Sequence, residues 1–388
     1  MSSISTWLED PFILIFCFVY VSAGITALSF LFTESIKNVL ERFKLSENFV
    51  GSSLLAMGTS LSETINAITA GIYDRGSGSN SHQNGEMSFS LNSLYNLTGA
   101  NLVQIVFLAC ATIFIWNRAR KIKFLRPECN RFIYSVFQGK LLLWTISTVE
   151  LALLGIFFLF KDFSKQLSIG GYSVIPFLFF IIWASYLIFS KKTTSSLENN
   201  SSAINQKQQL IPKYKNIFQN LSSFSFLIVF ILIFFAFAIL AFLNFNLVSR
   251  FEKTLGIDKN IGLGTILSLM TSLPEFSSFF FLYKSKCYDA ACSGFLGSAL
   301  FNLMLPTFTQ LLKGGWLIDS ISENDQKSLV FWIFTILIVN ICFAIGYFTN
   351  ERRTFLWGIR NVRWNISWSG TIILLYIVLS LVISPMFF

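Results

Sequence analysis

The sequence predicts an all-α membrane protein of about ten transmembrane helices, arranged as two inverted five-helix repeats. Three observations predict this fold class. First, 54% of the 388 residues are hydrophobic and only 13% are charged, a composition far too apolar for a soluble globular protein. Second, ten apolar runs approach or exceed the length of about 20 residues that crosses a bilayer. Third, a short polar motif with an acidic residue occurs once in each half of the chain.

The apolar runs fall into two groups of five, separated by one long polar segment. We therefore predict a first half at 1–190, a cytoplasmic linker at 191–222 and a second half at 223–388. The first run is expected to remain as a spanning helix, because Glu9 and Asp10 precede it and no small-residue cleavage site follows. The ten runs are residues 11–32, 50–72, 89–116, 132–160, 170–190, 223–245, 260–283, 288–312, 328–349 and 367–387.

Basic residues indicate which side of the membrane each loop faces. With both termini outside, 20 Lys and Arg residues lie in cytoplasmic loops and 8 lie in the opposite loops, as the positive-inside rule favours. Five spans per half then insert the two halves in opposite senses. The net charge of +9 is distributed over these short clusters, so we expect a lipid bilayer and inorganic cations as partners, and no nucleic acid.

An acidic residue, Glu63, lies inside the stretch Gly51–Tyr73, which is otherwise apolar and rich in small residues. A carboxylate at membrane depth costs at least about 3 kcal/mol, so it is kept where a cation, a proton or a polar cavity compensates it. A second acid, Glu275, recurs 212 residues later in the stretch Gly262–Tyr283. This duplication indicates a transporter built from two repeats.

The two stretches align as TSLSE at 59–63 and TSLPE at 271–275, and each precedes an apolar helix with small and amide residues. These helices contain YNLTGANLVQ at 95–104 and SGFLGSALFN at 293–302. Together the segments resemble the alpha-repeats of the calcium:cation antiporter superfamily, which includes the sodium/calcium exchangers. The resemblance covers about 51–107 for the first repeat and about 262–305 for the second.

A calcium ion takes six to eight oxygen ligands, and two glutamates supply the two negative charges that match it. The resemblance implies that threonine carbonyls beside the glutamates also line the site, and the adjacent serines would add hydroxyl oxygens. The expected ion-binding residues are Glu63, Glu275, Thr59, Thr271, Ser60, Ser272, Asn96, Asn101, Ser298 and Asn302.

The chain departs from the family pattern at several of these positions. Pro274 lacks an N–H and so frees the carbonyl of Met270. In the first repeat Ser62 stands where the family pattern has proline, so the carbonyl of Gly58 is not freed automatically, although the backbone freedom of Gly58 can loosen the turn. In the helix that follows the first motif, Gln104 departs from the family pattern. In the helix that follows the second motif, Gly294 and Ala299 stand where the pattern has amide side chains. The two half-sites are therefore chemically unequal, and two carboxylates suit one Ca²⁺, two Na⁺ or two protons equally well.

The expected function is secondary antiport of Ca²⁺ against Na⁺ or H⁺ by alternating access, with no bound cofactor, in the cell (plasma or inner) membrane. The alternatives are a proton-coupled exchanger of Mg²⁺, Mn²⁺ or K⁺, and a degenerate family member that does not transport. An enzyme is not expected, because the sequence has no HExxH motif, no protease-like pair of catalytic residues and no P-loop.

Three further polar residues invite interpretation. Lys140, in the run 132–160, is interpreted as reaching out to the membrane interface. Glu150, in the middle of the same run, is either a third charge in the ion path or a partner in an ion pair within the bundle. His82, in the Gly- and Ser-rich loop after Gly51–Tyr73, is interpreted as solvated.

Overall fold

The structure is a computed structural model that describes most of the chain. The described residues are 11–43, 45–77, 89–121, 140–160, 166–200, 217–255, 268–315, 323–354 and 369–374, with the isolated positions Glu128, Cys129, Phe132, Ser135 and Val136. His82 and residues 201–216 of the predicted linker lie outside this set.

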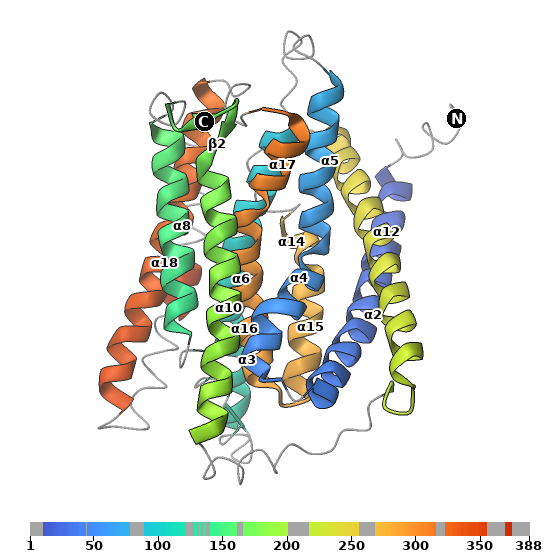
Figure 1. Cartoon of the computed structure of the whole chain (residues 1–388). Helices are drawn as coiled ribbons and strands as arrows, with labels where there is room; N and C mark the ends of the chain where they lie inside the picture. Colours follow the sequence, from blue (N-terminus) through green and yellow to red (C-terminus); the bar gives the residue numbers. More distant parts are fainter. Residues whose placement is uncertain are drawn as a thin grey trace.

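Pairs of long helices flank a central group of helices (Figure 1). Helix α2 (Pro11–Phe43) packs along α12 (Ser223–Leu255) on one side, and α8 (Leu141–Leu159) packs along α18 (Glu323–Thr354) on the other. Each pair takes one helix from each half of the sequence. The two halves are therefore interleaved across the whole bundle.

The central group contains the helices that carry the sequence repeats. The unbroken members are α6 (Phe89–Lys121) and α16 (Tyr288–Met304), and α16 leads into the short α17 (Pro306–Lys313). The other two members are interrupted, and their pieces are α3 (Glu47–Val50), η1 (Gly51–Leu55), α4 (Ala56–Thr59) and α5 (Leu61–Ser77) in the first, and α14 (Ser268–Thr271) and α15 (Leu273–Lys284) in the second. In Figure 1 the chain rises from α4 to α5 and descends from α14 to α15, so the two copies run in opposite directions.

Five helices in the described residues are long and apolar enough to cross a membrane. They are Phe12–Phe43, Phe89–Ala119, Leu142–Leu159, Ser223–Asn244 and Tyr288–Lys313. Two shorter apolar helices, Val174–Ser190 within α10 (Val174–Asn200) and Gln326–Cys342 within α18, match two more of the predicted runs. The last run is described only at 369–374, so the count of ten spans stays a prediction.

The outer face of α12 is apolar and exposed, as expected for a helix that faces lipid. Leu227, Ile231, Phe235 and Ile239 recur every four residues and are all exposed. This spacing places them on one face of the helix. An uninterrupted stripe of large hydrophobic side chains of this kind requires an apolar solvent.

Two local details differ from the expectations. The first helix does not end near residue 32 but continues to Phe43, because Lys37 pairs with Glu34 at 2.5 Å and also contacts the Ser285 hydroxyl, so these polar groups are satisfied inside the protein. The all-α fold also contains one small hairpin, in which β1 (Ser168–Ile169) pairs with β2 (Tyr172–Ser173). Its turn is Gly170-Gly171, with φ of 60° and 85°, the positive values that a tight hairpin turn requires.

Glycines allow η1 and α16 to touch along their backbones. A Cβ atom on Gly51 would lie 2.6 Å from the Ala290 carbonyl oxygen, and one on Gly297 would lie 2.5 Å from Ser52 Cα. Both distances are shorter than any carbon contact that packing tolerates. The first repeat is therefore held against the second with no space for a methyl group at either position.

Candidate functional site

Both repeat helices are interrupted at the same aligned residue. Ser60 separates α4 from α5 with φ −80° and ψ 20°, and Ser272 separates α14 from α15 with φ −84° and ψ 5°. Glu63 and Glu275 follow three residues later, each in the first turn of the next helix. Because backbone N–H groups point outward at a helix N-terminus, both carboxylates occupy the end of the helix that favours negative charge.

Glu275 accepts hydrogen bonds from both repeats. Its Oε1 atom accepts from the Ser60 hydroxyl of repeat one at 3.0 Å and from the Ser298 hydroxyl of α16 at 3.0 Å. The two serine hydroxyls also contact each other. Ser298 accepts a further hydrogen bond from Gln104 Nε2 at 3.1 Å. Glu275 is thus tied to α6 through a chain of two residues.

Glu63 is connected to the second repeat through its neighbour Ser62. The Ser62 hydroxyl lies 2.7 Å from Glu63 Oε2 and 2.8 Å from the carbonyl oxygen of Thr271. A hydroxyl has only one proton, so it can donate to only one of these acceptors at a time. Ser62 therefore competes for the Thr271 carbonyl that the family resemblance assigns to the ion.

The amide residues of the flanking helices join the same region. Thr271 Oγ1 donates to Asn96 Oδ1 at 3.0 Å, and the Ser268 hydroxyl donates to the Asn96 carbonyl at 3.1 Å. Asn302 Nδ2 donates to Asn101 Oδ1 at 3.4 Å. Each of these bonds joins one repeat to the other.

All ten residues predicted to bind the ion are buried, with exposed fractions of 3% or less. Glu63 and Glu275 lie near enough for their charges to repel each other. Within the described residues, Glu63 Oε1, Glu275 Oε2 and Ser272 Oγ have no hydrogen-bond partner. Two close, buried carboxyl groups with unsatisfied oxygens require positive charge, which a cation or protons can supply.

The composition of the site restricts what could coordinate a metal. Among the described residues, no group of three or more His, Cys, Asp or Glu side chains could hold a metal ion. Ligands beyond the two carboxylates would therefore come from hydroxyl, amide and carbonyl oxygens. Such an all-oxygen set suits hard cations such as Ca²⁺, Na⁺ or Mg²⁺ and does not suit zinc or copper.

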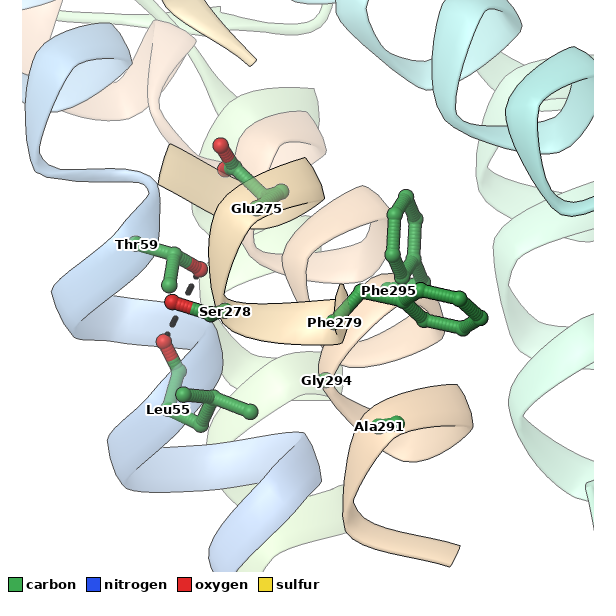
Figure 2. Close-up of a pocket in the computed structure, with 8 residues that line it drawn as sticks. All are labelled: Leu55, Thr59, Glu275, Ser278, Phe279, Ala291, Gly294 and Phe295. Atoms are coloured by element: carbon green, nitrogen blue, oxygen red, sulfur yellow. Dashed lines mark hydrogen bonds between the residues drawn. The ribbon is translucent and has the colours of Figure 1, made fainter. Parts of the chain in front are cut away.

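A small cavity extends from Glu275 toward the first turn of α16 (Figure 2). The Thr59 hydroxyl, which lines it, donates to the Leu55 carbonyl at the end of η1 at 2.9 Å. The Thr59 hydroxyl is therefore bonded within the first repeat. The cavity is lined by Leu55, Thr59, Glu275, Ser278, Phe279, Ala291, Gly294 and Phe295.

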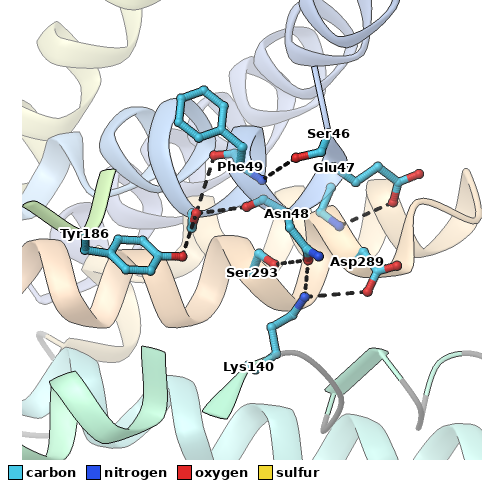
Figure 3. A network of polar contacts seen from close by, with 10 residues as sticks. Ser46, Glu47, Asn48, Phe49, Lys140, Tyr186, Asp289 and Ser293 are labelled. Atoms are coloured by element: carbon cyan, nitrogen blue, oxygen red, sulfur yellow. Dashed lines mark hydrogen bonds and ion pairs between the residues drawn. The ribbon is translucent and has the colours of Figure 1, made fainter. Parts of the chain in front are cut away.

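A polar cluster closes the bundle beyond this cavity, at the predicted cytoplasmic end (Figure 3). Lys140 donates to Asn48 Oδ1 and lies 3.5 Å from Asp289 Oδ1, while the Ser293 hydroxyl donates to the same Asn48 oxygen at 2.8 Å. Lys140 is 1% exposed, so the prediction that it reaches the interface is wrong: its ammonium group finds partners on α3 and α16 instead.

Glu47 belongs to the same cluster and lies just outside the predicted spanning segments. Its Oε2 atom accepts a hydrogen bond from the Ala290 N–H at 3.4 Å. Burial, and to a smaller extent the negative charge of Asp289, raise the pKa of Glu47 to about 7. Glu47 can therefore change its charge near neutral pH.

Sequence reasoning did not assign roles to three residues of the site. Ser62 and Gln104 were recognised only as departures from the family pattern, although Ser62 contacts both Glu63 and Thr271 and Gln104 supports Ser298. Ser268 was not singled out. The available signal was their chemistry, since each places a hydrogen-bonding side chain within four residues of a predicted ligand.

The family model described as sodium/calcium exchanger protein matches residues 13–191 and 225–384. Among curated proteins, none matches the chain.

Two solved structures share the fold. One is the sodium-calcium exchanger NCX_Mj soaked with Na⁺ and Sr²⁺, with 16% identity and a TM-score of 0.50 over 95% of this chain and 97% of that one. The other is the H⁺/Ca²⁺ exchanger CAX, with 14% identity and a TM-score of 0.56 over 96% of this chain and 89% of that one. The chain therefore belongs to the sodium/calcium exchanger protein family, whose members are integral membrane cation exchangers and not enzymes.

Proposed function

We propose that this protein exchanges Ca²⁺ for Na⁺ or H⁺ across the cell membrane, with the ions binding between Glu63 and Glu275. The observation that carries the proposal is the crossing of the two repeats at the helix breaks. Ser60 of the first repeat donates to Glu275 of the second, and Ser62 of the first contacts Thr271 of the second. A cation bound there would interact with both repeats at once.

Alternating access follows from this placement. The ligands belong to two repeats that run in opposite directions, so a relative movement of the helix groups would expose the same ions first to one side and then to the other. The carboxylates carry two negative charges in total. Either one Ca²⁺ or two monovalent cations would neutralise both carboxylates, so binding of Ca²⁺ would displace the monovalent cations and the reverse.

Reconstituted vesicles provide the direct test. We expect Glu63→Gln and Glu275→Gln each to reduce ⁴⁵Ca²⁺ uptake to the background of empty vesicles, because each removes one of the two charges and leaves the side-chain shape unchanged. The matched control is Glu41→Gln, the same change at an exposed position of α2. Uptake by either site variant at the wild-type rate would contradict the proposal.

The same assay identifies the coupling ion and the transported cation. Uptake is measured first under an imposed Na⁺ gradient and then under an imposed H⁺ gradient, and the gradient that drives it identifies the coupling ion. Competition by Mg²⁺, Mn²⁺ or K⁺ distinguishes an exchanger of another cation. No ion-dependent flux under any gradient would indicate a family member that does not transport.

A further inference from the structure

Glu150 lies in the middle of α8, away from the glutamate pair, and is completely buried. Neither of its carboxyl oxygens has a hydrogen-bond partner among the described residues. The ion pairs of the described residues do not include it either. A buried, unpaired carboxylate is among the most costly groups a protein can contain, so a positive charge is needed to neutralise it.

A cavity lies where α6, α8, α16 and α18 meet, and it reaches α8 at Ser147, one helical turn before Glu150. Its polar lining includes Gln104 from α6, Ser147 from α8 and Asn340 from α18. Gln104 and Asn340 are each 1% exposed. Within the described residues, Gln104 Oε1 and both side-chain polar atoms of Asn340 have no hydrogen-bond partner. Ser147 precedes Glu150 by three residues, which places the two on one face of α8.

Gln104 connects this cavity to the glutamate pair. Its Nε2 atom donates to Ser298 at 3.1 Å, and Ser298 donates to Glu275 Oε1 at 3.0 Å. Its Oε1 atom is the one left without a described partner. A single side chain therefore contacts the candidate exchange site at one end and lines the second cavity.

The charged groups on the helices that pack against α8 stand near the helix ends. Of the described side chains, Lys140 is at the start of α8, Asp289 is in the first turn of α16 and Lys327 is in the second turn of α18. The other described titratable side chains of these helices, of α6 and of α10 are Arg118 and Lys121 in the last turn of α6, and the thiols and phenols of Tyr95, Cys110, Tyr186, Tyr288, Cys292 and Cys342. None of them can provide the missing positive charge at the level of Glu150.

We propose that Glu150, Ser147, Gln104 and Asn340 form a second site that takes one monovalent cation, either Na⁺ or a proton. The available donors are a carboxylate, two amide oxygens and a hydroxyl, which suit a small hard cation. One carboxylate matches one positive charge. The inference goes beyond the proposed exchange of Ca²⁺ at Glu63 and Glu275, and it adds a monovalent ion that Ca²⁺ does not replace directly.

The test measures ligand-dependent thermal stability of the full-length protein in detergent, since a ligand that binds only the folded state raises Tm. Wild type and Glu150→Gln are titrated with NaCl at constant ionic strength and constant pH, then with pH in the absence of Na⁺, then with CaCl₂. We expect Glu150→Gln to lose at least about half of either the Na⁺-dependent or the pH-dependent shift and to keep the Ca²⁺-dependent shift. Loss in the Na⁺ series identifies Na⁺ as the occupant, and loss in the pH series identifies a proton.

Asn340→Leu is the second variant, which removes one cavity-lining amide and keeps Glu150. We expect it to move the midpoint of the affected series by about fivefold, the equivalent of one hydrogen bond. Glu41→Gln is the control and should follow wild type in all three series.

Two results would overturn the inference. In the first, Glu150→Gln and Asn340→Leu follow wild type in both monovalent series. In the second, Glu150→Gln also loses the Ca²⁺ shift, which would place Glu150 in the main site or in the general stability of the bundle. Absence of a Ca²⁺ shift in the wild type would contradict the proposed exchange function and leave the monovalent series interpretable.

Discussion

The two half-sites have the same backbone break and different side chains around it. In the first repeat, Ser60 and Ser62 both reach hydrogen-bond acceptors in the second repeat, at Glu275 and at the Thr271 carbonyl. In the second repeat, Pro274 has no donor, and Ser272 Oγ lies near Glu63 of the first repeat without a hydrogen bond among the described residues. Of the four serine and proline positions compared, only those of the first repeat donate across the break, whereas Thr271 and Ser268 of the second repeat donate in the other direction, to Asn96.

This difference shows that the break does not depend on proline. The helix is interrupted at Ser60 with nearly the same dihedral angles as at Ser272, although only the second repeat has a proline two residues later. Ser62 occupies the second position of its helix, where a backbone N–H has no partner inside the helix in any case. Either residue therefore suits the position, and serine adds a hydroxyl that proline lacks.

The largest effect on Ca²⁺ transport is expected from Ser60→Ala, compared with the same change at the aligned Ser272. Ser60→Ala removes a predicted ion ligand whose hydroxyl also holds Glu275 against the first repeat, and hydrogen bonds to charged groups contribute about 1.5–3 kcal/mol. We expect the half-saturating Ca²⁺ concentration for vesicle uptake to rise at least about tenfold. Ser272→Ala is the matched comparison, and we expect a change of less than about twofold, because Ser272 Oγ has no hydrogen bond to lose among the described residues. Equal effects at the two positions would show that the half-sites are equivalent when ions are bound.

A smaller effect, of opposite sign, is expected at Ser62. Ser62→Ala removes the hydroxyl that competes for the Thr271 carbonyl, so Ca²⁺ should bind about fivefold more tightly, the equivalent of one neutral hydrogen bond. Ser62→Pro should behave similarly, because the position tolerates a residue without an N–H. Isothermal titration with Ca²⁺ measures both. Weaker binding in Ser62→Ala would instead identify the Ser62 hydroxyl as an ion ligand.

The smallest effect is expected from the aligned threonines. Thr271→Val removes the donor to Asn96 Oδ1 of the other repeat and should lower the free energy of unfolding by about 1 kcal/mol. Thr59 donates to a carbonyl of its own repeat, so Thr59→Val should have almost no effect. Denaturant unfolding of the two variants in detergent compares them. A larger loss for Thr59→Val would mean that its hydroxyl has a role beyond its own repeat.

The sequence predicted the parts of the fold that depend on hydropathy and on internal repetition. The apolar runs correspond to helices in the described residues, and the duplicated motif identified the two helices that are broken and face each other. Less could be predicted where contacts join residues distant in the sequence. Lys140 was placed at the interface because its run is apolar, yet Asn48 and Asp289, which bind it, belong to other parts of the chain.

The sequence identified most residues of the site but not the hydrogen bonds between them. Glu63 and Glu275 stood out because an acid within an apolar helix is costly, and the position of their serines followed from the alignment. The alignment could not show that Ser62 contacts the Thr271 carbonyl, because that contact depends on how the two breaks face each other. For the same reason Gln104 was interpreted only as a departure from the family pattern, whereas its side chain donates a hydrogen bond to Ser298 on the neighbouring helix.

The backbone contact at Gly51 and Gly297 limits how the bundle can open on the side of α3. Residues with a Cβ atom flank both glycines, so shifting α16 by one residue along η1 would force a side chain into a gap too small for a methyl group. The two helices can therefore separate at this contact, but they cannot shift along each other. Opening the bundle between these two helices therefore requires η1 to lift away from α16, which also breaks the contacts of Asn48 with Lys140 and Ser293.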